Sequence, residues 1–128
     1  MRRLVLLLPA LLAACAGGLD ARVTPAMDGC VAARNPVFVA GNGATALDVP
    51  LPAGVDSMAR ELAYDAAFQR FRDIATEATT QAVLVCALEL GAHSRTAASR
   101  TWLRRYERHP DAPVQAAART LLVRFPPL

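Results

Sequence analysis

One stretch of the chain, Gln81 to Leu90, constrains the fold most. Its centre, AVLVCAL, is apolar on every side of a helix, and a helix of that kind is stable only when other elements surround it. Aromatic residues make up 5% of the chain, and alanine is abundant. These features predict a mainly α fold, in which closely spaced helices surround residues 81–90 and bury them most deeply.

The flanking segments predict three more helices, over residues 56–75, 94–108 and 111–124. The first has apolar residues at a 3.6-residue period, including Tyr64. Gly91 is expected to end the central helix, with Ser94 and Asp111 as caps of the next two. Short joins indicate antiparallel neighbours. We therefore expect residues 56–128 to form a small antiparallel helical-hairpin domain.

The preceding segment, residues 25–55, is expected to be a small helix followed by an irregular or β-hairpin stretch. Thr24 can cap the helix, Pro25 suits its first position, and Asn35-Pro36 should stop it. Residues 37–40 and 45–51 read as two short strands around the turn residues 41–43. Because an isolated hairpin is marginally stable, an irregular cover packed over the helices is favoured over the hairpin for this stretch.

The first residues, MRRLVLLLPALLAAC, have the pattern of an export signal. Two arginines precede an apolar run, and that run is shorter than the roughly 20 residues a membrane span needs. Leu12-Ala13-Ala14-Cys15 resembles the lipobox of bacterial lipoproteins. The resemblance implies that residues 1–14 are removed, that Cys15 carries lipid, and that residues 15–24 form a tether. Ordinary signal cleavage after Ala16 is the alternative.

The same resemblance implies a location. In lipoproteins of bacteria with two membranes, a residue other than Asp after the lipidated cysteine usually directs the protein to the outer membrane. Here that residue is Ala16. The expected location is therefore the periplasmic face of the outer membrane, with the N-terminal lipid in the bilayer. A periplasmic or secreted protein follows from the alternative cleavage.

Two cysteines remain if Cys15 carries lipid. Cys30 and Cys86 in an exported chain favour a disulfide, because such compartments are oxidising. The alternative is two unpaired thiols, with Cys86 acting as a small buried apolar residue.

Charge is distributed unevenly along the chain. Residues 19–92 hold five arginines against nine acidic residues, whereas residues 93–128 hold seven arginines against two. Such asymmetry favours an anionic partner, unless the two halves neutralise each other by packing together.

The predicted helix over residues 94–108 carries an arginine stripe. Ala98, Trp102 and Tyr106 share one face at a spacing of four residues, and the nearly opposite face is basic. Arginine suits bidentate contacts with carboxylate or phosphate, so this face is a candidate site for an acidic partner protein, lipid phosphate or glycan. An ordinary solvated face is the alternative. The candidate residues are Arg100, Arg104, Arg105 and Arg108.

Residues 81–124 resemble a tetratricopeptide repeat. The resemblance rests on Ala98-x3-Trp102-x7-Pro110 and on the join RRYERHPDAP into the next helix. Cys86 stands where the family usually has glycine. The resemblance implies an α-hairpin architecture, and it implies protein or peptide binding as the general role.

No enzyme signature occurs in the sequence. There is no G-x-S-x-G, H-E-x-x-H, C-x-x-C or phosphate loop. His93 and His109 are expected at the surface, and the spacing of cysteine and histidine fits no zinc pattern. A near-neutral exported chain argues against nucleic acid. We therefore expect neither cofactor nor metal, and a non-enzymatic, lipid-anchored accessory or scaffold subunit that binds another envelope protein. The alternative is binding to an anionic envelope polymer or lipid head groups; oligomeric state is left open.

Overall fold

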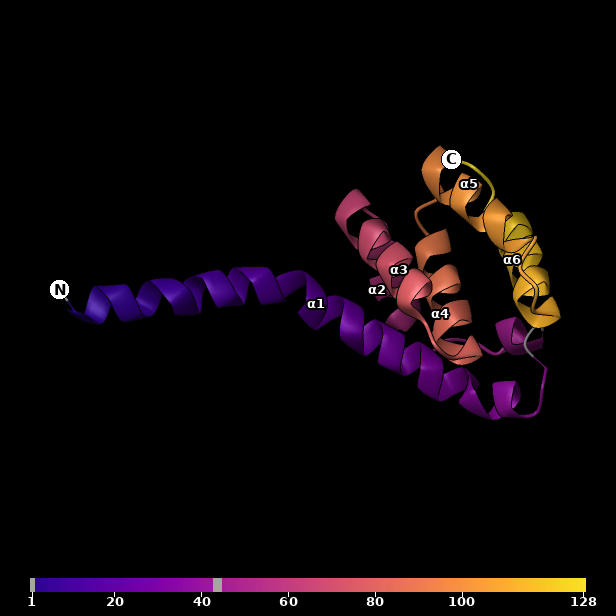
Figure 1. Ribbon diagram of the computed structural model, residues 1–128, viewed down its shortest axis with the longest axis horizontal. Coiled ribbons are helices and arrows are strands. Elements are labelled where there is room, and N and C mark those ends of the chain that lie inside the picture. Colours follow the sequence, from indigo (N-terminus) through magenta and orange to yellow (C-terminus); the bar gives the residue numbers. More distant parts are fainter. Residues whose placement is uncertain (1, 43–44) are drawn as a thin grey trace.

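The computed structural model describes the backbone of residues 2–42 and 45–128, with side chains from residue 18 onward in those ranges. The mainly α prediction is confirmed, and the described residues contain no strand (Figure 1). The elements, in order, are α1 (Arg2–Val39), the 3₁₀ helix η1 (Thr45–Asp48), α2 (Val55–Glu61), α3 (Asp65–Glu77), α4 (Gln81–Ala92), α5 (Ala97–Tyr106) and α6 (Ala112–Arg124).

Helix α4 is the centre of the molecule, as its all-round apolar sequence predicts. Every residue from Leu84 to Ala92 is buried, and α4 contacts α1, α3, α5 and α6. The first part of α1 extends away from the other helices, while its second part runs beside them (Figure 1). The apolar surface of α4 is thus divided among four neighbours, which is why each of them needs only one apolar face.

Threonine side chains fix where two of the helices begin. Thr80 Oγ1 accepts a hydrogen bond from Val83 N at the start of α4, and Thr96 Oγ1 accepts one from Ser99 N at the start of α5. Such caps satisfy backbone donors that the first turn leaves free. Ser94, the expected cap of α5, instead shares a hydrogen bond with Thr96. At α6, Asp111 is the N-cap residue without a side-chain capping bond.

Gly91 has a different role from the expected helix stop, because α4 continues to Ala92. A Cβ at position 91 would lie 2.6 Å from Cζ3 of Trp102. The missing side chain therefore lets the indole of α5 lie directly against α4. Trp102 also makes an edge-to-face contact with Phe68 of α3, with ring centroids 5.4 Å apart.

The N-terminal segment differs from its prediction in two ways. Residues 20–24 belong to α1 and contact the body, with Val23 buried and Asp20 paired to Arg70, so they do not form a free tether. Pro25 and Pro36 lie inside α1 rather than bounding a short helix. The carbonyls that lose a partner to each proline belong to Ala21 and Ala32, which are exposed, so water can satisfy them.

The β-hairpin prediction over residues 37–51 is wrong for the described residues. Val37–Val39 form the last turn of α1, where Phe38 is buried, and Thr45–Asp48 form η1. Gly43 of the predicted turn lies outside the described residues. Ala46 and Leu47 of η1 are buried, and residues 49–54 follow as an irregular connection.

The helix predicted over residues 56–75 is two helices. α2 ends at Glu61 and α3 begins at Asp65. Tyr64, expected in the core, is the extended N-cap residue of α3 and is 77% exposed. The 3.6-residue period predicted the buried face of α3 correctly, with Ala67, Phe68, Phe71 and Ala75 all buried.

Candidate functional site

The arginines of the predicted stripe separate into two groups. Arg100 Nη1 donates to the backbone oxygens of Leu122 and Phe125, at 3.2 and 2.7 Å. These are carbonyls at the end of α6, which a helix leaves without intrahelical partners. Arg100 therefore holds the C-terminal end of α6 against α5. Arg104, Arg105 and Arg108 are exposed, with Arg108 beyond the end of α5 at Tyr106.

A groove between α3 and α5 lies beside these exposed arginines. It has a volume of about 330 Å³ and is lined by Arg72, Ala97, Ala98, Thr101, Trp102 and Arg105. Its α5 wall combines three small residues, Ala97, Ala98 and Thr101, with the ring of Trp102, and Arg72 of α3 and Arg105 of α5 also line it. Ala98, expected to face the core with Trp102, is exposed here. The small side chains let another polypeptide come close to the backbone of α5, and two guanidinium groups line the same groove.

The sequence pattern did not indicate Arg72 as a site residue. It lies on α3, 33 positions before Arg105, and its guanidinium carbon sits 5.8 Å from the centroid of the Phe68 ring. Phe68 in turn contacts Trp102. This chain of contacts places the Arg72 side chain beside the α5 face, and only the contact of Phe68 with Trp102 in the folded protein reveals it.

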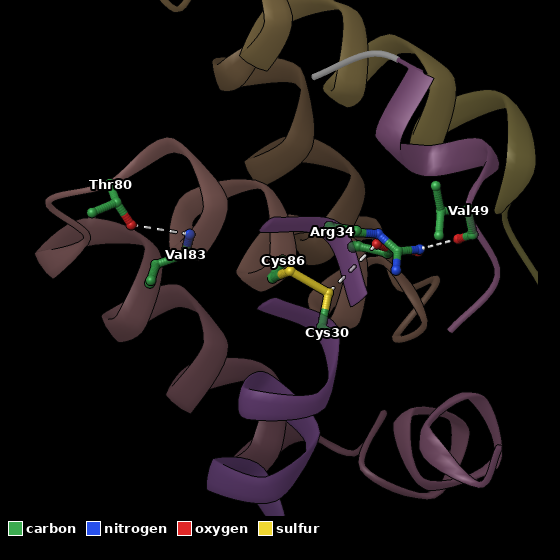
Figure 2. Close-up of a disulfide and its surroundings, with 7 residues drawn as sticks. Cys30, Arg34, Val49, Thr80, Val83 and Cys86 are labelled. Atoms are coloured by element: carbon green, nitrogen blue, oxygen red, sulfur yellow. Dashed lines mark hydrogen bonds and ion pairs between the residues drawn. A yellow bond between two sulfur atoms is a disulfide. The ribbon is translucent and has the colours of Figure 1, made fainter. Parts of the chain in front are cut away.

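The Cys30–Cys86 disulfide joins α1 to α4, with the two Cα atoms 5.9 Å apart (Figure 2). This prediction is confirmed. Both cysteines are fully buried. One helical turn further along each helix, Arg34 of α1 and Glu89 of α4 form an ion pair with a 2.7 Å separation between Nη2 and Oε1. A covalent and an ionic link therefore connect the same two helices.

The Arg34–Glu89 pair is buried, with side chains only 1% and 4% exposed. Arg34 Nη2 also donates to the backbone oxygen of Val49, at 2.7 Å (Figure 2). Its Nε and Nη1 have no hydrogen-bond partner among the described residues. Burial raises the pKa of Glu89 above its ordinary 4.5, an effect that Arg34 opposes. The pair fixes the segment after η1 to α1 and α4.

A polar cavity of about 270 Å³ adjoins this pair. His93 lines it and is almost fully buried, contrary to the surface position expected, with Nε2 3.8 Å from Asp56 Oδ1. Burial lowers the pKa of His93 below 6.5. The ionisable residues lining the cavity are Arg34, Asp48, Asp56, Glu89, His93 and Arg124. Because acidic and basic groups are mixed, the cavity favours neither anions nor cations.

Two further properties concern only the described residues. They hold no cluster of three or more histidine, cysteine, aspartate or glutamate side chains that could bind a metal. Among them, no helix is both long enough and apolar enough to cross a bilayer. The side chain of Cys15, the predicted lipidation site, lies outside the described residues.

Comparison of the chain with models of protein families, with curated proteins and with solved structures finds no match.

Proposed function

We propose that this protein is a lipid-anchored envelope protein that binds another envelope protein through the α3–α5 groove and acts as a non-enzymatic accessory or scaffold subunit. The observation that carries the binding proposal is that Arg72 and Arg105 line one groove together with the small residues Ala97, Ala98 and Thr101. Small side chains let a partner backbone approach, and guanidinium groups bind carboxylates in a bidentate manner. An acidic segment of the partner fits this combination.

The anchor part of the proposal rests on the lipobox resemblance at Leu12–Cys15. Acylation of Cys15 would hold the protein at a membrane, and three acyl chains exceed the two anchoring signals that stable attachment needs. The intact mass of protein taken from membranes of a native-like bacterial host tests this. A mass of residues 15–128 plus three acyl chains supports the anchor, and an unacylated mass beginning near Gly17 contradicts it.

The tetratricopeptide-like reading of residues 81–124 belongs to the same proposal. Helices α4, α5 and α6 are joined by short segments and contact one another in sequence, as expected of stacked α-hairpins. In this reading the α3–α5 groove is the surface on which a partner peptide lies.

A photo-crosslinking amino acid at Ala98, in the groove, tests the binding proposal in the native host. We expect one discrete crosslinked partner, lost when Arg72 or Arg105 is changed to Glu. Arg119→Glu is the matched control, because Arg119 is exposed on α6 outside the groove. Unchanged crosslinking after both reversals in the groove would contradict the proposal. A heterogeneous product that fades with each arginine removed and with rising salt would indicate an anionic polymer or lipid surface.

A further inference from the structure

A second groove lies between α1 and α3, and it shares no lining residue with the α3–α5 groove. Both helices pack on α4 and make few contacts with each other, so a trough remains above α4. Its volume is about 400 Å³. The lining residues are Thr24, Met27, Asp28, Val31, Ala32, Ile74 and Val83.

The trough runs along α1 for about two helical turns. Its five α1 residues follow the spacing i, i+3, i+4, i+7 and i+8 from Thr24 to Ala32, which places them on one stripe of the helix. The lining from α3 and α4 is aliphatic, and Met27 of α1 lines the trough although most of its side chain is buried in the core. This largely apolar stripe is about two turns long and runs along α1, which suits a partner helix packed alongside α1.

The exposed charge beside the trough is acidic on balance, because Arg70, one turn before Ile74 on α3, is already paired with Asp20 at 3.0 Å. Asp28 lines it, is exposed, and forms no ion pair with the described residues. Glu77 is exposed one turn after Ile74 on α3, on the same side of that helix. Residues 19–92 as a whole hold nine acidic residues against five arginines. An occupant with basic flanks therefore complements this surface, the opposite of what the α3–α5 groove selects.

We propose that the trough docks a basic amphipathic helix of a partner protein, with aliphatic residues on one face and lysine or arginine on either side. Such a helix would pack with its axis about 8–10 Å from those of its neighbours. It would complete a four-helix arrangement with α1, α3 and α4. The proposal is independent of the function proposed for the α3–α5 groove. Together, two surfaces of opposite charge would let the protein bridge two different partners.

Two fluorescent helical peptides test the proposal. They share one leucine stripe at i, i+3, i+4 and i+7, and they differ only in having lysine or glutamate on the flanks. Binding is measured by anisotropy against the full lipidated protein in discs of zwitterionic lipid, with empty discs subtracted. We expect the lysine peptide to bind and the glutamate peptide to bind at least about tenfold more weakly.

Substitutions locate the binding. Ala32→Gln puts a larger neutral side chain into the trough and is expected to weaken the lysine peptide about tenfold. Asp28→Asn is expected to weaken it about two- to fivefold, as for an exposed ion pair. Asp65→Asn is the matched control for charge, because Asp65 is exposed on α3 and lies nine positions before Ile74, on the opposite side of that helix from the trough. Arg105→Glu should leave binding unchanged, which separates this site from the α3–α5 groove.

Several outcomes would overturn the proposal. Equal binding of the two peptides would remove the charge argument, and binding of neither would remove the site. Displacement of the lysine peptide by palmitate at equimolar concentration would indicate an acyl chain as the natural occupant. Self-association that Ala32→Gln abolishes would indicate that a second copy of the chain covers the trough. Circular dichroism of each variant confirms that it remains folded.

Discussion

Arg34 and Glu89 form the buried ion pair between α1 and α4. Both are buried, and each is the other's ionic partner. Removing one partner leaves a buried charge uncompensated, so Arg34→Ala or Glu89→Ala should lower the free energy of unfolding by about 3–5 kcal/mol in urea titrations. The double variant Arg34→Met with Glu89→Leu should recover most of this loss, because it leaves no buried charge.

The exposed pair Arg22–Glu61 is the control for that prediction. Its two side chains are 50% and 68% exposed, and pairs of this kind contribute at most about 1 kcal/mol. Arg22→Ala should therefore have little effect. A loss from Arg34→Ala as small as that from Arg22→Ala would contradict the structural role assigned to the buried pair.

His93 makes stability depend on pH. Burial lowers the pKa of His93 in the folded protein below 6.5, so the unfolded chain binds a proton more readily than the folded one. The contribution of His93 to the free energy of unfolding is therefore fully present above pH 6.5, and it is lost as the pH falls from 6.5 through the folded pKa. In urea titrations across this range, the free energy of unfolding should fall less with decreasing pH for His93→Gln than for the unsubstituted protein. Identical pH profiles for the two proteins would show that His93 does not cause the pH dependence of stability.

At the scale of elements, the contact of α4 with α5 depends on the absence of a side chain at position 91. Gly91→Ala would put a Cβ 2.6 Å from the Trp102 ring, and relieving such overpacking costs about 1–3 kcal/mol. We expect lower stability and a changed fluorescence spectrum, since Trp102 is the only tryptophan in the sequence.

Gly18→Ala is the matched control at this scale. Gly18 also lies within a helix, and a Cβ there would meet nothing within 4 Å. Because alanine favours helix over glycine by about 1 kcal/mol, this substitution should not destabilise the protein. If the two substitutions changed stability equally, the close contact between Gly91 and Trp102 would not be the cause of the loss at position 91.

At the scale of the whole molecule, the disulfide ties α1 to the core. Cys30 and Cys86 are 56 positions apart, and closing a loop of that length contributes about 4 kcal/mol in the chain-entropy model. The variant with both cysteines changed to serine should unfold at a clearly lower urea concentration than the oxidised protein. Equal midpoints for the variant and the oxidised protein would show that packing and the Arg34–Glu89 pair suffice to hold α1.

Sequence patterns predicted the elements that depend on local periodicity. The predicted helices over 81–90 and 111–124 agree closely with α4 and α6, because apolar spacing and caps are local signals. The continuation of α1 through Pro25 and Pro36 was not predictable from propensity, since tertiary contacts of Val23, Cys30 and Phe38 outweigh the prolines.

The candidate sites were less predictable than the helices. Arg72 and Arg105 are far apart in sequence, and they line one groove only because the fold brings α3 beside α5. Arg100 belongs to the same periodic stripe as Arg104, yet it holds the end of α6. Periodicity identifies which residues share a face, but the neighbouring helix decides which of them are free to bind.

The position of the Cys30–Cys86 bridge has a consequence for proteolysis. The irregular segment at residues 49–54 lies between the two bridged cysteines. A protease that cuts there divides the polypeptide without releasing either piece. The nicked protein would migrate at its full mass on a denaturing gel and separate into two fragments only after a reducing agent is added. Cleavage within residues 49–54 therefore does not release α1 from the rest of this protein while the disulfide is intact.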